Sequence, residues 1–251
     1  MDLSLSKQLA LVLVTFFFSV VGGITGIGIA TIIVPLLIFL GASLPFAKST
    51  ALWINISVMS LSVYKRRRNI RLSLALPLVV SAFLLAPLGA KFSFYLPEKV
   101  QLLLLASFVF ISALGVLFLK PKARVSGVTK SGFIKVGILL GAFAGFIGGM
   151  LGIGGGIIAN PLLIILGFDP LVVTSVSSVM VLLSSLSGWI TYWTLGYFSY
   201  SLALPLFVSA FAGSYIGNLL SQRISKDAVK KVVGYFALLV AIVTYLKAFT
   251  L

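Results

Sequence analysis

The chain has 251 residues, of which 60% are hydrophobic and 9% are charged, and apolar runs of twenty or more residues recur along it. This composition excludes an ordinary soluble domain and predicts an all-α polytopic membrane protein, in contact with lipid over much of its surface. The 19 Lys and Arg residues outnumber the 4 acidic ones and lie mostly between apolar runs. Basic residues between the apolar segments of a membrane protein are typical of cytoplasmic loops, so no nucleic-acid partner is expected.

Residue types that are missing narrow the chemistry further. The chain has no Cys and no His, which removes disulfides, thiol chemistry and the commonest zinc and haem ligands. Its four acids lie in the termini or between apolar segments, whereas cation transporters and proton relays usually rely on carboxylates within the membrane. We therefore expect no enzyme, no catalytic residue, no metal and no cofactor.

Eight apolar segments follow one another in two sets of four. We predict a first repeat over 1–119, a basic linker over 120–135 and a second repeat over 136–251. The segments run roughly over 8–40, 45–64, 72–95 and 98–119 in the first repeat, and over 136–166, 170–193, 199–220 and 228–249 in the second.

The two sets are a duplication. Placing residue 22 over residue 148 aligns GGITGIGIATIIVPLLIFLG with GGMLGIGGGIIANPLLIILG, and SLALPLVVSAF at 73–83 nearly repeats as SLALPLFVSAF at 201–211. Two separate sequence blocks that align in the same order are not expected by chance. Internal repeats of this size are typical of transporters, whose substrate site lies between the repeats near the bilayer midplane.

The first segment of each half is too long for one straight span. Thirty-odd helical residues would extend roughly 45–50 Å, against a hydrocarbon core of about 30 Å. A glycine cluster lies near the middle of each, so we predict a re-entrant hairpin or a discontinuous helix, with the second half-helices beginning near Gly28 and Gly154. Whether these segments turn back or span is left open.

Loop charge favours the hairpin. Eight plain spans place twelve of the 19 basic residues inside, whereas two hairpins make the repeats inverted and place fourteen inside. The loops 65–71, 120–135 and 223–231 would then be cytoplasmic. The basic 65–71 loop also corresponds to the uncharged 194–199 loop, as inverted repeats predict. Parallel repeats with diverged loops remain the alternative.

The segment centres offer backbone, hydroxyl and amide groups, which suit an anion. A helix that begins at a glycine turn presents unpaired N–H groups and the positive end of its dipole. Two such starts facing each other could hold one small oxyanion. We predict substrate-binding residues in and after the glycine clusters: Gly26, Gly28, Gly152, Gly154, Gly155, Gly156 and Asn160.

Glycines and prolines in membrane helices also have structural roles. Helix breaks or hinges are predicted at Gly22, Gly23, Pro35, Gly148, Gly149 and Pro161, although kinking alone explains the prolines equally well. Close helix packing is the preferred reading for Gly89, Gly115, Gly141, Gly145, Gly213 and Gly217.

Polar side chains recur in the next segment of each half. Ser and Thr side chains often donate hydrogen bonds to backbone carbonyls of their own helix. Each of these residues can therefore be either a substrate ligand or a purely structural residue. Lys48 is expected to be a charge at a segment end that reaches water. The predicted substrate-binding side chains are Ser49, Thr50, Asn55, Thr174, Ser175 and Ser178.

These residues give the chain a resemblance to the TauE/SafE family of membrane transporters, over nearly its whole length. GIGGGIIANPLL at 152–163 is similar to the family's glycine-rich signature, and Thr174 and Ser175 to its Thr-Ser pair. The first copy departs from both, reading GIGIATIIVPLL and Lys48-Ser49, so the site is not fully symmetric and Lys48 could add an anion-attracting charge. The resemblance implies movement of sulfite or a related sulfonate.

We therefore expect a secondary transporter of the cell membrane that moves a small inorganic or organic sulfur anion by alternating access. An anion channel with the same donors but no alternating gate is the alternative, and a non-transporting scaffold is a third interpretation. The sequence leaves open which anion moves, in which direction and with which coupling ion. It also leaves open whether the chain forms a homo-oligomer.

Overall fold

In the computed structural model, described over residues 5–25, 28–118, 130–220 and 226–249, the chain forms ten α-helices and two short 3-10 turns. The described residues contain no strand. The first half holds α1 (Leu5–Thr25), α2 (Ala30–Phe39), α3 (Leu44–Arg66), η1 (Arg67–Asn69), α4 (Leu72–Phe92), η2 (Ser93–Tyr95) and α5 (Glu98–Phe118). The second half holds α6 (Lys130–Leu151), α7 (Gly156–Ile165), α8 (Pro170–Thr194), α9 (Tyr200–Leu220) and α10 (Lys226–Phe249).

The helices have the length and polarity that a bilayer requires. Within the described residues, five stretches are long and apolar enough to cross a membrane: Leu72–Tyr95, Glu98–Gly115, Ile134–Leu151, Val172–Thr194 and Tyr200–Leu220. Shorter apolar helices cover Gln8–Ile24, Ala30–Phe39 and Ala237–Phe249. The prediction of an all-α multi-pass membrane protein is confirmed.

Each half opens with two helices where the sequence has one long apolar segment. α1 ends at Thr25 and α2 begins at Ala30, while α6 ends at Leu151 and α7 begins at Gly156. Between α6 and α7, three glycines adopt the left-handed backbone conformation with φ of 74–75°: Gly152, Gly154 and Gly155. A side chain would strain the backbone at these positions, which explains why this turn is built of glycine.

The short second helices start and end in the same way in both halves. The carbonyls of Ile29 and Gly155, which are aligned residues, each accept hydrogen bonds from the N–H groups three and four residues later. At the other end, Gly41 and Gly167 have φ of 87° and 88° and close α2 and α7 with equivalent bonds. The duplication seen in the sequence is therefore kept in local geometry.

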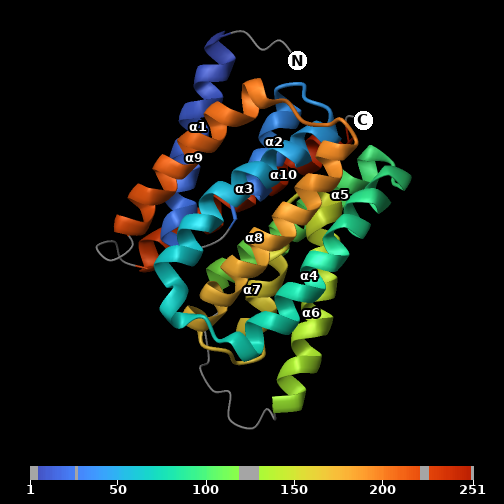
Figure 1. The fold of residues 1–251 in the computed structure, drawn as a ribbon. Helices are drawn as coiled ribbons and strands as arrows, with labels where there is room; N and C mark the ends of the chain where they lie inside the picture. The colour runs from blue at the N-terminus through green and yellow to red at the C-terminus, as the bar shows by residue number, and fades with distance from the viewer. Residues whose placement is uncertain (1–4, 26–27, 119–129, 221–225, 250–251) are drawn as a thin grey trace.

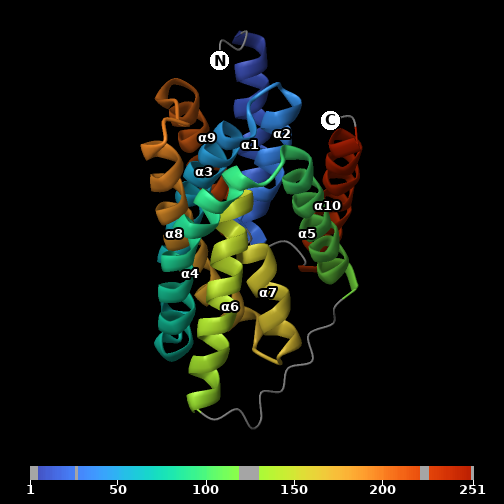
Figure 2. The ribbon, with the colours of Figure 1, turned by 90° about the vertical axis from the view of Figure 1, so that its right-hand side faces the viewer.

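Helices of one half pack against helices of the other. α1 lies beside α9 and α4 beside α6, α3 packs against α8, and α5 packs against α10 (Figures 1 and 2). In the repeat, α1 corresponds to α6 and α4 to α9, so exchanging the two halves turns the α1–α9 contact into the α6–α4 contact. The same exchange leaves the α3–α8 and α5–α10 contacts unchanged. The packing thus has the two-fold pattern of the repeat.

Glycines allow these helices to approach closely. A Cβ on Gly89 in α4 would lie 1.9 Å from the carbonyl oxygen of Phe146, and one on Gly217 in α9 would lie 2.0 Å from that of Val20, the aligned contact. Gly141, Gly145 and Gly213 are equally tight. The packing interpretation is confirmed for these five glycines and stays a prediction for Gly115.

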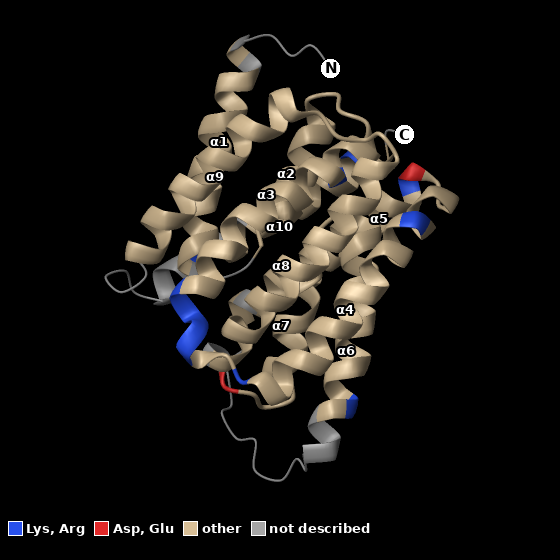
Figure 3. Cartoon of the chain, viewed as in Figure 1, with Lys and Arg blue, Asp and Glu red and all other residues tan. Residues whose placement is uncertain are grey.

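Charged side chains lie at the ends of the helices. Figure 3 shows Lys and Arg gathered at the end of α3 and near the start of α6, and a mixed group of charges at the α4–α5 junction, at the upper right of the view. The predicted 120–135 linker is shorter than expected, because α6 begins at Lys130 and a turn and a half of helix replaces its last residues.

Candidate functional site

Asn55 of α3 joins the two helix breaks. Its Oδ1 accepts a hydrogen bond from the N–H of Ala30, the first residue of α2, at 3.2 Å. Its Nδ2 donates to the carbonyl oxygen of Ile153, in the α6–α7 turn, at 3.3 Å. One fully buried amide therefore holds together two segments that lie more than a hundred residues apart.

The glycines of the two breaks make room for this amide. A Cβ on Gly28 would lie 2.9 Å from Oδ1 of Asn55, and one on Gly154 would lie 2.9 Å from Nδ2. Both glycines are buried. Of the predicted site residues, Asn55, Gly28 and Gly154 are thus brought together, whereas Gly26 lies outside the described residues.

Two serines of α8 complete the surroundings of the α6–α7 turn. The hydroxyl of Ser184 donates to the carbonyl oxygen of Gly154 at 3.0 Å, and that of Ser185 lies 3.5 Å from Nδ2 of Asn55. Neither serine was predicted from sequence, because the aligned residues of the first half are Val58 and Met59 and give no repeated signal.

The start of α7 presents backbone donors. The N–H groups of Ile153 and Gly154 are used, since both donate to the carbonyl oxygen of Gly148 and close α6. The N–H groups of Gly156 and Ile157 have no acceptor among the described residues. Buried N–H groups are nearly always paired, so these two donors are available for a ligand at the positive end of the α7 dipole.

Predicted side chains around the breaks also have unused polar atoms. The hydroxyls of Ser49 and Thr50 in α3 are fully buried and have no hydrogen-bond partner among the described residues, and the same holds for the buried Oδ1 of Asn160 in α7. Burying a polar atom without a partner is costly. The two hydroxyls can donate to an anion, whereas the amide oxygen of Asn160 only accepts hydrogen bonds.

The predicted polar residues of α8 are placed differently. Ser178 donates to the carbonyl oxygen of Thr174 at 2.6 Å, a bond within its own helix. Ser175 is fully buried and Thr174 half-buried, near the start of α8, whereas the aligned Ser49 lies near the start of α3. α3 and α8 run in opposite directions in Figure 1. The polar residues at the start of α3 and those at the start of α8 therefore lie toward opposite ends of the molecule.

The predicted break residues lie beside the breaks rather than at them. Gly22 and Gly23 belong to α1, and Gly148 and Gly149 to α6. Gly149 is a packing residue, because its Cβ would lie 2.1 Å from a carbonyl oxygen of α4. The prediction of a hinge at these four positions is therefore corrected: the helices continue through them to Thr25 and Leu151.

Pro35 and Pro161 lie inside α2 and α7, as predicted. Pro161 has no N–H for the carbonyl oxygen of Ile157, four residues earlier. Ser112 of α5 donates to that oxygen at 2.7 Å and satisfies it. A neighbouring helix thus satisfies the carbonyl oxygen that Pro161 leaves free.

Side chains from α3 and α8 cap the helices that end at the breaks. Arg66 lies within 3.4–3.5 Å of the carbonyl oxygens of Gly23 and Ile24, at the end of α1. Its aligned residue, Tyr192, donates from its hydroxyl to the carbonyl oxygen of Gly149 at 3.1 Å. These caps were missed, since one is a cation in a basic cluster and the other an aromatic residue, yet the repeat alignment pairs them.

Lys48 does not reach water. Its side chain is 1% exposed and its ammonium donates to Oε1 of Gln101 in α5. The prediction of a solvated charge is therefore wrong, because neighbouring helices enclose the start of α3.

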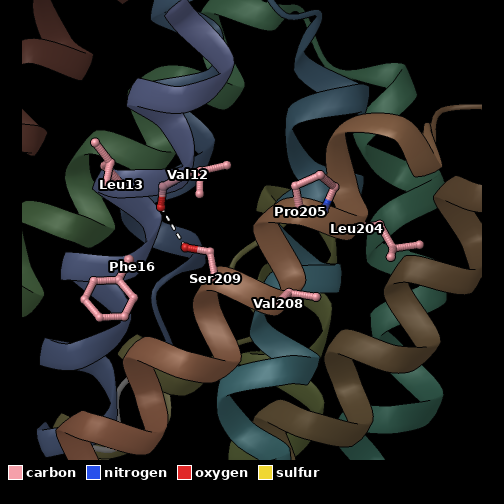
Figure 4. Close-up of a pocket in the computed structure, with 7 residues that line it drawn as sticks. All are labelled: Val12, Leu13, Phe16, Leu204, Pro205, Val208 and Ser209. Carbon is pink, nitrogen blue, oxygen red and sulfur yellow. Dashed lines mark hydrogen bonds between the residues drawn. The ribbon is translucent and has the colours of Figure 1, made fainter. Parts of the chain in front are cut away.

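A hollow of about 500 Å³ lies between α1 and α9 (Figure 4). Its one polar side chain is already used, since the hydroxyl of Ser209 donates to the carbonyl oxygen of Val12 at 2.7 Å. The hollow offers no anion donor and suits lipid chains. It is lined by Val12, Leu13, Phe16, Leu204, Pro205, Val208 and Ser209.

Comparison with known proteins gives one consistent result. The family described as "Sulfite exporter TauE/SafE" matches residues 11–244. The chain is 27% identical to the probable membrane transporter protein YdhB of Bacillus subtilis over 87% of this chain and 94% of that protein. It is 23% identical to the probable membrane transporter protein MJ0441 of Methanocaldococcus jannaschii over 91% and 94% of the two chains.

A match over a shorter part of the chain has a higher sequence identity. Sulfite exporter TauE/SafE family protein 6 of Arabidopsis thaliana is 36% identical over 32% of this chain and 19% of that protein. No solved structure matches the chain. Because the family match spans nearly the whole sequence and the fold is a multi-pass helical membrane protein with glycine-rich breaks, the chain belongs to the TauE/SafE family of membrane transporters.

Proposed function

We propose that this protein is a secondary transporter that moves a small sulfur-containing anion, sulfite or an organosulfonate, across the cell membrane by alternating access. The name of the family refers to sulfite export, and two relatives of similar length are described as probable membrane transporter proteins. The anion is held between the two helix breaks, by backbone N–H groups more than by charged side chains.

The observation that carries this proposal is the Asn55 bridge. It places the start of α2 and the α6–α7 turn on the two sides of one side chain. The free N–H groups of Gly156 and Ile157 belong to that turn, and the hydroxyl of Thr50 is buried and unpaired one to two helical turns before Asn55. An oxyanion accepts hydrogen bonds from such N–H and O–H donors.

The two halves are inverted repeats in this proposal. α1 begins and α2 ends toward one end of the molecule, whereas α6 begins and α7 ends toward the other (Figures 1 and 2). The basic ends of α3 and α6 would then share the cytoplasmic side (Figure 3). Rocking one set of helices against the other around the fixed breaks would expose the anion to each side in turn.

The substrate's own protonation is the proposed means of coupling. Sulfite and bisulfite interconvert near neutral pH, and the four acidic residues of the chain lie near the N-terminus, in a loop or in the first turn of a helix. A proton would therefore cross on the anion and not on a carboxylate.

Flux in proteoliposomes tests the function. The wild-type protein is expected to move labelled sulfite down its gradient, and a Gly154→Val and Gly155→Val double variant is expected to lose that flux, because side chains there would fill the turn. Gly196→Val is the control, since Gly196 also has a positive φ but nothing lies within 4 Å of its Cβ. Unchanged flux in the double variant would refute this site, and unitary currents well above carrier turnover would favour a channel.

Impermeant labelling tests the topology. A cysteine introduced in the 194–199 loop is expected to react from outside the cell and one in the 65–71 segment from the cytoplasm. Labelling of the 194–199 loop only from the cytoplasm would contradict the inverted repeats.

A further inference from the structure

Lys48 is a buried cation without a buried counter-charge. Its side chain is 1% exposed, and no ion pair is found for it within the described residues. Glu98, the acidic residue at the start of α5, is exposed and so does not provide a buried counter-charge. Enclosing an ammonium in a protein is costly unless an anion or several acceptors compensate it.

The one acceptor that contacts this ammonium is held in a fixed orientation. Nε2 of Gln101 donates to the carbonyl oxygens of Ser93 at 2.6 Å and Leu96 at 2.8 Å, so Oε1 must face Lys48. An ammonium has three N–H donors. Gln101 takes one of them, and the described residues provide no hydrogen-bond acceptor for the other two, although the ammonium also lies 6.0 Å from the centroid of the Tyr192 ring.

The Lys48 side chain lies directly against the α6–α7 turn. A Cβ on Gly152 would lie 2.5 Å from Cβ of Lys48 and 2.6 Å from its Cγ. The stem of Lys48 therefore occupies the space that a side chain at Gly152 would need, and the ammonium extends from the turn toward Gln101. The Lys48 stem is thus adjacent to the α6–α7 turn, and the free N–H groups of Gly156 and Ile157 follow directly after that turn.

We propose that the Lys48 ammonium is part of the anion site, and that it sets a preference for divalent over monovalent anions; this rests on the proposed transport function. The residue aligned with Lys48 is Thr174, so only one of the two halves carries this charge. Backbone N–H groups and hydroxyls bind anions of either charge. A fixed cation adds an attraction that grows with the charge of the ligand.

The charge dependence gives a quantitative test. Sulfate serves as the dianion and methanesulfonate as the monoanion, each competing with labelled sulfite flux into liposomes that contain the full chain. Because Coulomb attraction is proportional to ligand charge, the factor lost for sulfate in Lys48→Met should be about the square of that lost for methanesulfonate. A tenfold loss for the monoanion would accompany roughly a hundredfold loss for the dianion.

Matched variants separate a charge effect from a structural one. Lys48→Arg keeps the charge and is expected to stay within about threefold of wild type for both anions. Gln101→Met removes the hydrogen bond but leaves the charge, so the sulfate-to-methanesulfonate ratio should not change. Lys48→Thr copies the residue of the second half and should behave like Lys48→Met.

The outcomes are distinct. If Lys48→Met folds and its sulfate-to-methanesulfonate ratio is unchanged, this inference is wrong while the transport function still stands. The inference is also wrong if Gln101→Met changes that ratio as much as Lys48→Met does. If the single variants do not fold, the Lys48→Met, Gln101→Leu double variant removes the polar pair together and is read in the same way. Absence of sulfite flux in the wild-type protein would instead count against the proposed function.

Discussion

Replacing Asn55 by Leu should loosen both helix breaks at once. Leu has nearly the shape of Asn but can neither accept from the N–H of Ala30 nor donate to the carbonyl oxygen of Ile153. Each buried backbone group left without a partner costs about 1–3 kcal/mol. The two bonds, at 3.2 and 3.3 Å, are longer than the usual 2.9–3.0 Å, which places each in the lower part of that range. The expected loss in the free energy of unfolding is therefore about 2–4 kcal/mol.

Equilibrium unfolding in mixed micelles measures this loss. Ser62→Ala is the matched control, because Ser62 is buried in the same helix but its hydroxyl donates to Val58 of that helix, at 3.0 Å. Its removal should cost about 0–1 kcal/mol. A loss for Asn55→Leu no larger than that of the control would refute the bridge between the breaks.

Three further substitutions test the packing, the caps and the site. Gly145→Ala should cost about 1–3 kcal/mol in unfolding experiments, because the new methyl group would lie 2.4 Å from a backbone atom of α4. Gly188→Ala should be nearly neutral, because its methyl group would meet the end of a side chain at 3.2 Å and a backbone Cα atom at the ordinary contact distance of 3.8 Å. Tyr192→Phe removes a buried cap and should cost about 1–2 kcal/mol, more than Tyr245→Phe, whose hydroxyl pairs with Ser107 in a half-buried position; equal losses would argue against the cap. Thr50→Val should leave stability within about 1 kcal/mol, since its hydroxyl has no protein partner, but should weaken sulfite binding about 3–10-fold in thermal-stabilisation titrations.

The glycine-rich turn between α6 and α7 has a local cause. Adjacent glycines that need positive φ, such as Gly154 and Gly155, can be recognised within a few residues of sequence. Asn55 was predicted as a substrate-binding residue because it is one of several polar side chains in an apolar segment, and that role stays a prediction. Which partners Asn55 finds depends on how α3 packs between the two halves, and no local pattern contains that information.

The errors share a physical cause. Lys48 was expected in water because it lies near the start of a segment, but the depth of a residue depends on the helices that surround it, and α3 is enclosed. Gly149 was expected to break a helix, yet in α6 it allows α4 to approach. A glycine that packs and one that breaks a helix look alike in sequence, and only the neighbouring backbone distinguishes them.

Binding of selenite, a heavier analogue of sulfite, tests the central claim most directly. Anomalous diffraction from crystals of the protein with selenite is expected to place one selenium atom between the breaks, with its oxygens within about 3 Å of the N–H groups of Gly156 and Ile157. Strong selenium density anywhere else, with none between the breaks under conditions that support sulfite flux, would contradict the account.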